Sequence, residues 1–290
     1  MSFETISVPV TGGHLNVGTQ MGREGAPVVV LIHGITANHL TWAMVADELG
    51  DDATLLAPDL RGRAGSAGLP GPYGMAAHAD DIRSVLDHVG TDTATIVGHS
   101  MGAFVGAAFA VNHADRMDAL VLVDGGVSFG TLPEGADIDE VLTQILGPTM
   151  QRLSMTFESV DAWLEFWKQH PALEEWNDAI EAYVMADLIG EAPSLRSGCN
   201  VDAIRADGAD TLGDGGQFFR RLTKPTPWLR APRGLLNQVP PLFPDDVAAA
   251  MCSEVPALQD HLVDDVNHFT ITLSARGAAD TAAVIRSQLP

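Results

Sequence analysis

The stretch TATIVGHSMGAFVGAAFA, residues 93–110, constrains the fold more than any other part of this 290-residue chain. Its first half is a β-branched apolar run typical of a buried strand, and its second half is rich in alanine, as helices are. A strand that becomes a helix with almost no linker must turn sharply, and a sharp turn needs glycine, which Gly98 and Gly102 supply. We therefore predict a strand–turn–helix unit that projects the Ser100 hydroxyl.

The rest of the chain alternates between strand and helix patterns. After an expected antiparallel hairpin in the first 20 residues, the apolar run APVVVLIHG predicts a strand that is covered on both faces. Strand and helix patterns then alternate as far as MDALVLVDGG and resume at TPWLRAP. This alternation predicts an α/β fold with a mostly parallel sheet and helices on both faces, in which ligands bind at the carboxyl ends of the strands.

The alternation is interrupted by residues 128–222, which carry helical patterns only. We predict that they form an all-helical cap, inserted as a lid into a core made of residues 1–127 and 223–290. Aromatic residues at helical spacing in this insertion mostly indicate packing. We expect Trp163 and Trp167 to face the pocket, which would favour an apolar substrate, and Gly34 to contact the substrate as well.

Composition limits the partners of this chain. It has 38 acidic and 16 basic residues and a net charge of -22, a balance that repels nucleic acids and anionic membranes. No apolar run approaches the roughly 18 residues that span a bilayer, and the start lacks a signal-peptide pattern. Cys199 and Cys252 are far apart and show no zinc-site spacing. We expect a cytoplasmic protein with reduced thiols that binds neither nucleic acid nor membrane; nothing in the sequence indicates an oligomeric state.

The Ser100 turn has the G-x-S-x-G pattern of a nucleophile elbow, although a glycine-rich helix start capped by serine would read similarly. A serine hydroxyl needs a general base at neutral pH. Of the ten histidines, His268 in DDVNHFTITLS follows the last predicted strand and so lies at the carboxyl edge of the sheet. We predict that His268 is the base.

The acid that would orient this histidine is harder to assign. In this topology it commonly follows the seventh strand, where the chain reads TPWLRAPRGLLNQ and has no aspartate. Asp124, at the end of the sixth strand in LVLVDGG, is our candidate, although it could simply cap the turn. Alternatives remain open later in the chain, namely Asp245 or Asp246 and, after them, Asp264 or Asp265.

An oxyanion would need two backbone N–H donors near the reacting carbonyl. Met101, at the start of the helix, would give one, and Ile35, after Gly34 in HGITANHLTW, would give the other. The turn at His33 and Gly34 could instead be no more than a tight exit from the preceding strand. Asp59 and Arg61, in APDLRGRAGS, are expected to form a structural ion pair.

With HGITANHLTW, PDLRGRAGS, VGHSMGAFVG and VNHFTI in this order, the chain resembles the α/β-hydrolase superfamily, in its esterase-like branch with a helical cap. The resemblance implies an eight-stranded sheet and a Ser-His-Asp triad of Ser100, His268 and Asp124, with no metal or organic cofactor. It also implies a serine hydrolase that cleaves a carboxylic ester, or a related acyl bond, of a small substrate through an acyl-enzyme. Alternatives on the same fold are carbon–carbon bond hydrolases, lactonases, thioesterases and perhydrolases, or a member that only binds a small ligand.

Overall fold

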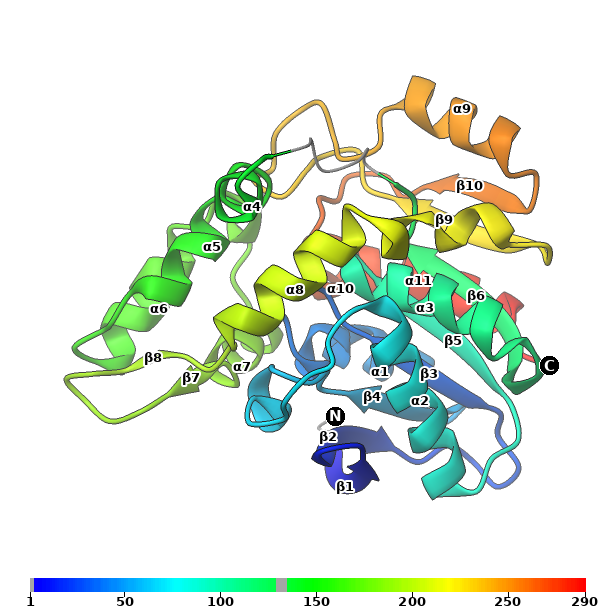
Figure 1. The fold of residues 1–290 in the computed structure, drawn as a ribbon, viewed down its shortest axis with the longest axis horizontal. Coiled ribbons are helices and arrows are strands. Elements are labelled where there is room, and N and C mark those ends of the chain that lie inside the picture. Colours follow the sequence, from blue (N-terminus) through cyan, green and yellow to red (C-terminus); the bar gives the residue numbers. More distant parts are fainter. Residues whose placement is uncertain (1–2, 129–134) are drawn as a thin grey trace.

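A computed structural model describes residues 3–128 and 135–290 and contains the predicted mostly parallel sheet of eight strands (Figure 1). The strands lie in the order β1-β2-β4-β3-β5-β6-β9-β10, and β2 pairs antiparallel with both β1 and β4, while the other pairs are parallel. Their bounds are β1 Glu4–Val10, β2 Gly13–Gln20, β3 Val28–Ile32, β4 Thr54–Pro58, β5 Ala94–His99, β6 Met117–Val123, β9 Thr226–Arg230 and β10 Leu258–Leu262.

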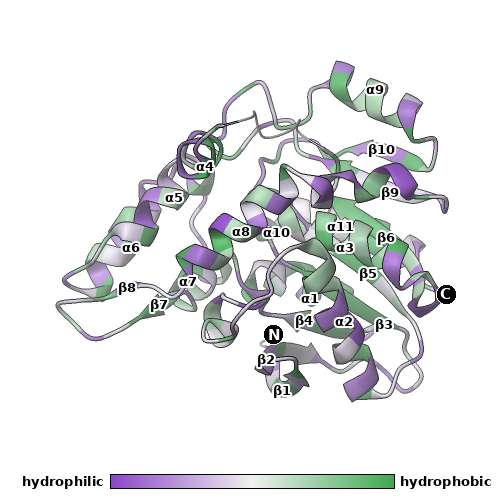
Figure 2. Cartoon of the chain, in the orientation of Figure 1, coloured by the Kyte–Doolittle hydropathy of each residue, from purple (hydrophilic) through white to green (hydrophobic). Residues whose placement is uncertain are grey.

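The central strands are hydrophobic (Figure 2) and are almost entirely buried, as their continuous apolar runs predict. Alternate residues of β3 point to opposite layers: Val30 and Ile32 join one core cluster, and Val29 and Leu31 join the other. The first layer is covered by α2 Met75–Val89, α3 Met101–Asn112 and α9 Asp245–Glu254. The second is covered by α1 Ala43–Leu49, α10 Thr270–Leu273 and α11 Ala275–Ser287. The fold is therefore a three-layer α/β/α sandwich.

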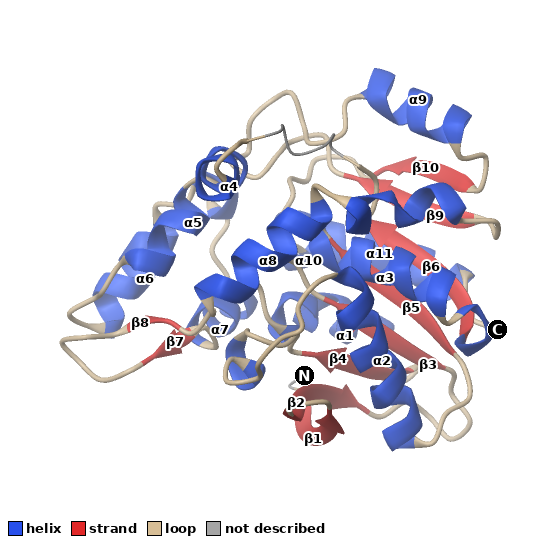
Figure 3. Ribbon diagram, viewed as in Figure 1, coloured by secondary structure: helices blue, strands red, loops and turns tan. Residues whose placement is uncertain are grey.

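The segment between β6 and β9 lies beside the sheet and is mostly helical (Figure 3). Its helices are α4 Ile138–Leu146, α5 Pro148–Gln151, α6 Val160–Lys168, α7 Asp178–Met185 and α8 Val201–Thr211. The expectation of helices alone was wrong in one detail, because β7 Leu188–Ile189 pairs with β8 Arg196–Ser197 in a small antiparallel sheet. Strands of two residues are too short to show an alternating pattern.

This segment has an apolar cluster of its own, which also takes in a few core residues such as Ala37, Leu235 and Phe269. The 3₁₀ helix η6, Asp214–Arg221, packs on α3, and its Phe219 joins the main core. The division into a core and a cap at residues 128–222 stays a prediction. Within the described residues, no helix has both the length and the apolarity required to span a bilayer.

Candidate active site

Ser100 lies in the turn between β5 and α3, in a backbone conformation that L-residues rarely adopt. Its φ is 55° and its ψ is -122°, and such strained residues persist only where their surroundings hold them. A Cβ at Gly98 would lie 2.1 Å from the carbonyl oxygen of Gly102, and a Cβ at Gly102 would lie 2.1 Å from that of Ile32. Only glycine fits at both positions, so these glycines allow the sharp turn that leaves Ser100 part-exposed at the carboxyl edge of the sheet.

His268 lies four residues after Asp264, in the loop that follows β10, and it contacts Asp124 from the end of β6. The two buried side chains are joined by a hydrogen bond of 2.7 Å from Nδ1 to Oδ2. The other carboxylate oxygen, Oδ1, accepts from the amide of Ala231 at 3.0 Å, just after β9. With Nδ1–H donated to the carboxylate, Nε2 of His268 is left with a free lone pair.

The alternative acids lie elsewhere. Asp245 is mostly exposed and pairs with Arg230 at 3.1 Å, while Asp265 pairs with Arg233 at 3.0 Å. Asp264 is also exposed and lies 3.6 Å from Arg276. Asp246 is in the first turn of α9, where the helix dipole stabilises a carboxylate. Of the five candidate aspartates, only Asp124 hydrogen-bonds to His268 within the described residues.

Ser100 and His268 line the same cavity, which has an empty volume of about 480 Å³. In the part of the chain that the structure describes, no hydrogen bond joins the Ser100 hydroxyl to the His268 ring. Hydrogen bonds of this kind are often long without substrate and tighten when it binds. The arrangement therefore brings a hydroxyl, an imidazole and a carboxylate together at one rim of the sheet.

Both predicted oxyanion donors border Ser100. Ile35 and Met101 line its cavity, and Met101 is the first residue of α3, so its amide has no partner inside the helix. Gly34 approaches Ser100 so closely that a Cβ on it would lie 3.1 Å from the Ser100 Cβ. A side chain at position 34 would therefore crowd the hydroxyl.

His33 fixes the start of the Ile35 turn. Its Nε2 accepts from the Leu60 amide at 2.9 Å, so Nδ1 carries the hydrogen and donates to the Gly34 carbonyl at 2.7 Å. Burial lowers the pKa of His33 to about 4, which keeps the ring neutral near pH 7. Because the Gly34 carbonyl and the Ile35 amide belong to one planar peptide unit, His33 also orients the Ile35 N–H.

His99, next to the nucleophile candidate, packs behind His268 with ring centroids 4.7 Å apart. Its Nε2–H donates to the His268 carbonyl at 2.8 Å. Burial, and then the nearby His268, hold the pKa of His99 well below its usual range. His99 is thus a neutral support for the loop that carries His268.

The rest of the cavity wall is mostly apolar and comes largely from the segment between β6 and β9. Sequence reasoning missed these residues, because an amphipathic pattern shows that a helix has an apolar face but not what that face covers. The wall is formed by Phe104, Leu142, Ile145, Leu146, Gly208, Thr211, Leu212, Leu235 and Leu242. A second cavity, also bordered by Ser100 and His268, is lined by Thr41, Thr149 and Tyr183 among others.

Trp163 and Trp167, predicted to contact substrate, line neither of these two cavities. Both are fully buried in the apolar cluster of the insertion, and the Trp163 indole donates to the Val184 carbonyl at 3.1 Å. Their positions match packing, the ordinary role of aromatic residues at helical spacing.

The expected ion pair between Asp59 and Arg61 was wrong. Asp59 instead accepts from the backbone and ring of His39, both at 2.9 Å, while Arg61 forms a two-pronged pair with Asp81 at 2.6 and 2.7 Å. Adjacent side chains on a tight turn point in different directions, so proximity in sequence did not predict pairing. Among residues 3–128 and 135–290, no cluster of three or more His, Cys, Asp or Glu could hold a metal ion.

The chain is similar to known proteins over part of its length. A protein of Mycobacterium tuberculosis is 39% identical over 100 residues, which are 34% of this chain and 29% of that protein. A fluoroacetate dehalogenase of Burkholderia sp. is 32% identical over 117 residues, 39% of this chain and 38% of the relative. The match to these curated relatives thus spans only about a third of their length.

Solved structures are similar over almost the whole chain. The crystal structure of E-2-(acetamidomethylene)succinate hydrolase matches with a TM-score of 0.78 and 22% identity, over 98% of both chains. This likeness concerns the fold. A family model described as alpha/beta hydrolase fold matches residues 27–175, just over half of the sequence. The chain therefore belongs to the α/β-hydrolase fold family.

Proposed function

We propose that this chain is a serine hydrolase that cleaves a carboxylic ester of a small, mostly apolar substrate through an acyl-enzyme. The observation that supports this most is the 2.7 Å hydrogen bond between His268 and Asp124, next to a cavity that both His268 and Ser100 line. Residues 128–222 act as the cap over this site and supply most of its apolar wall.

In the first half of the reaction, the Ser100 oxygen attacks the ester carbonyl carbon while Nε2 of His268 takes the hydroxyl proton. The Ile35 and Met101 amides stabilise the oxyanion of the tetrahedral intermediate. When the intermediate collapses, the bond from the carbonyl carbon to the alcohol oxygen breaks, and His268 returns the proton to the alcohol. The acyl group is then an ester of Ser100.

In the second half, a water molecule attacks the acyl carbon and gives a proton to Nε2 of His268. The bond to the Ser100 oxygen breaks, the serine regains its proton, and the carboxylic acid leaves. Asp124 accepts from Nδ1–H throughout, which keeps Nε2 free as the base and stabilises the imidazolium that forms in each half.

The character of the cavity favours a substrate with an apolar chain. Leucine and isoleucine side chains provide most of its inner wall, and mostly apolar walls with a few polar groups are typical of small-molecule sites. An apolar wall does not distinguish an oxygen from a sulfur leaving group, or an open ester from a cyclic one. Lactones and thioesters therefore belong in the same substrate screen.

The test is hydrolysis of p-nitrophenyl esters with acyl chains of increasing length, beside a lactone and a thioester. We expect Ser100→Ala to lower kcat at least a thousandfold. Ser84→Ala, which removes a part-exposed hydroxyl on α2, serves as the matched control and should keep full activity. Ester hydrolysis by Ser100→Ala at the wild-type rate would contradict the assignment.

A second measurement separates catalysis from simple ligand binding. A fluorophosphonate probe should label wild-type protein covalently and leave Ser100→Ala unlabelled, since only an activated serine attacks phosphorus. Wild-type protein that takes up no label would favour a member of the family that only binds a small molecule.

A further inference from the structure

The turn that carries the Ile35 amide is held by buried cations. The Ile35 carbonyl accepts from Nε of Arg63 at 2.9 Å, and the Thr36 carbonyl accepts from Nη2 of Arg152 at 2.9 Å. Both arginines are fully buried. With the Gly34 carbonyl held by a buried histidine, three successive carbonyls of one turn have side-chain donors, so the peptide planes on both sides of Ile35 are fixed.

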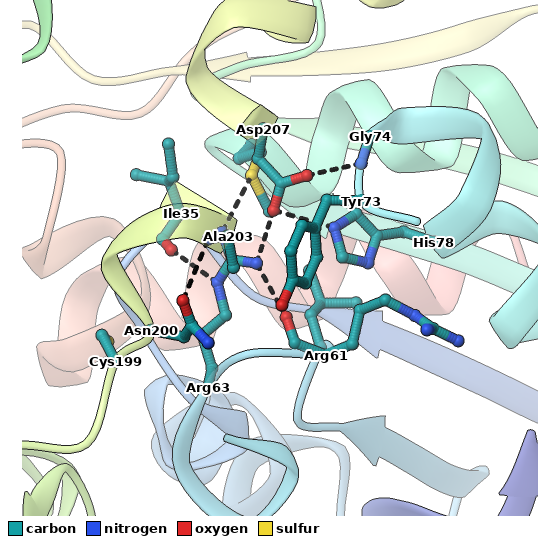
Figure 4. Close-up of polar contacts among 12 residues, drawn as sticks. Ile35, Arg61, Arg63, Tyr73, Gly74, His78, Cys199, Asn200, Ala203 and Asp207 are labelled. Atoms are coloured by element: carbon teal, nitrogen blue, oxygen red, sulfur yellow. Dashed lines mark hydrogen bonds and ion pairs between the residues drawn. The ribbon is translucent and has the colours of Figure 1, made fainter. Parts of the chain in front are cut away.

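Arg63 takes its countercharge from α8. One of its guanidinium nitrogens pairs with Asp207, which also accepts from the His78 ring at 2.9 Å and from the Gly74 amide at 2.6 Å (Figure 4). Burial alone would raise the pKa of Asp207, but the Arg63 and His78 partners hold this pKa below its usual value. The carboxylate is therefore charged at neutral pH, and α8 is tied to the core through it.

Arg152 takes its countercharge from the same insertion. Its Nε and Nη2 contact one carboxylate oxygen of Asp187 at 3.1 and 2.9 Å, and its Nη1 donates to the Thr149 carbonyl at 3.0 Å. The guanidinium also stacks over the Trp167 ring at 4.9 Å. Trp167, which does not touch the cavity, thus helps to position a group that does contact the Ile35 turn.

Because of the Arg63–Asp207 and Arg152–Asp187 pairs, the conformation of the Ile35 turn depends on the insertion. A buried guanidinium that loses its carboxylate is strongly unfavourable, and it moves to find another partner or water. Either movement would take the guanidinium donor from the Ile35 carbonyl or from the Thr36 carbonyl, which would keep only the weaker Cys199 thiol at 3.6 Å. Asp207 also precedes Gly208, whose backbone lines the cavity, so the substrate wall and the anchor of the turn lie on the same helix.

We propose that Arg63 and Arg152, held by Asp207 and Asp187 of the insertion, are positioning residues that set the Ile35 oxyanion donor. The oxyanion hole would then be complete only when the insertion is seated on the core. This inference rests on the proposed serine-hydrolase function. It goes beyond that function because it assigns part of the transition-state geometry to ion pairs that do not touch the substrate.

The test compares Asp207→Asn and Asp187→Asn with Asp81→Asn. The last variant breaks the buried pair of Asp81 with Arg61, whose side chain does not contact the turn, and is the matched control. Losing a whole oxyanion donor costs about a hundredfold to a thousandfold in kcat. For a displaced donor we expect a fall of about tenfold to a hundredfold in Asp207→Asn and Asp187→Asn, with KM changed less than threefold.

A transition-state analogue gives an independent measure. A trifluoromethyl ketone forms an oxyanionic adduct with an active serine, so its affinity should fall by the same factor as kcat in Asp207→Asn and should not fall in Asp81→Asn. Equal kcat and equal inhibitor affinity in these two variants would overturn the proposal. Hydrolysis that survives in Ser100→Ala would instead overturn the serine-hydrolase function, so the two failures are distinguishable.

A double variant separates positioning from stability. Arg63→Met with Asp207→Asn removes both charges of the pair and keeps a polar side chain beside the His78 ring and the Gly74 amide, so its thermal stability should recover from that of Asp207→Asn toward wild type. We expect kcat to stay low, because nothing then holds the Ile35 carbonyl. Recovery of kcat together with stability would mean that the pair is only structural. Hydrogen exchange in the peptide that contains residues 33–42 needs no substrate; it should be faster in Asp207→Asn than in Asp81→Asn, and equal exchange would overturn the proposal.

Discussion

The two walls of the cavity are held in place in different ways. On the sheet side, backbone hydrogen bonds fix the polar groups: the Ser100 amide donates to the Val123 carbonyl at 2.9 Å, and the Asp124 amide donates to the Leu229 carbonyl at 2.7 Å. On the opposite side, the wall consists of side chains such as Leu142 and Leu146, which are held by apolar packing.

This difference suits the sheet side to catalysis and the apolar side to the choice of substrate. Hydrogen bonds are directional, so the sheet side can hold reacting groups to within a fraction of an ångström. Apolar contacts are not directional, and residues of similar volume replace one another at small cost. We therefore expect substitutions on the sheet side to change the rate of the reaction and those on the apolar side to change which substrate is preferred.

The largest effect should come from Asp124→Asn. An amide can hold the His268 ring in the wrong tautomer, with the hydrogen on Nε2, and comparable substitutions in serine proteases lower kcat by about ten-thousandfold. We expect a fall of at least about a thousandfold in p-nitrophenyl ester hydrolysis, with unchanged KM. Asp245→Asn is the control and should keep activity, because Asp245 pairs with Arg230 at the surface. If Asp124→Asn kept its activity, another residue would have to be the acid that orients His268.

The next effect concerns stability, to which buried histidines on both sides contribute. Burial lowers the pKa of His33 on the sheet side, and burial followed by the Arg152 charge lowers that of His170 in the insertion, each to about 4. These rings stay neutral in the folded protein and become protonated in the unfolded chain near pH 6.5. The unfolded state then binds more protons, so the free energy of unfolding falls as pH drops from about 6.5 to about 4, by up to about 1.4 kcal/mol per pH unit for each histidine.

Urea unfolding at pH 7.5, 6.0 and 5.0 measures this slope. His170→Phe should make the slope shallower by up to one proton, because the sheet-side histidines remain. An unchanged slope in His170→Phe would mean that His170 takes up its proton in the folded state, and that the two sides of the cavity differ in this respect too.

The smallest effect should appear on the apolar side. Each buried methylene contributes about 0.8 kcal/mol, so kcat/KM should rise about fourfold per added acyl carbon until the cavity is full. Leu142→Ala enlarges the cavity and should move the best substrate to a longer chain without a large loss of kcat. Leu173→Ala, a buried change in the same apolar cluster but outside the cavity wall, is the control and should leave the preferred length as it is. A large loss of kcat in Leu142→Ala would contradict the division of roles.

Local patterns in the sequence were enough to predict the strand order along the chain, the turn at Ser100 and the edge of the sheet at which the polar residues gather. The edge could be predicted because the carboxyl ends of parallel strands all lie at one edge of the sheet. The pairing of Arg63 with Asp207 joins residues 144 positions apart and has no local pattern. The same is true of the cavity wall, because periodicity could not tell Leu142, which borders the cavity, from Trp163, which is packed away from it.

The placement of Asp124 at the end of β6 has a consequence for how such a protein can change over generations. β6 and β9 are neighbours in the sheet, and position 233, just past β9, pairs with Asn267, the residue before His268. The Ala231 amide, just after β9, already donates to Asp124 Oδ1 at 3.0 Å, so a carboxylate on either strand end would lie near the same ring. A lineage that carried carboxylates at both strand ends for a time could lose either one. The residue that orients the ring can therefore change from one strand to the other while the ring always keeps an acidic partner.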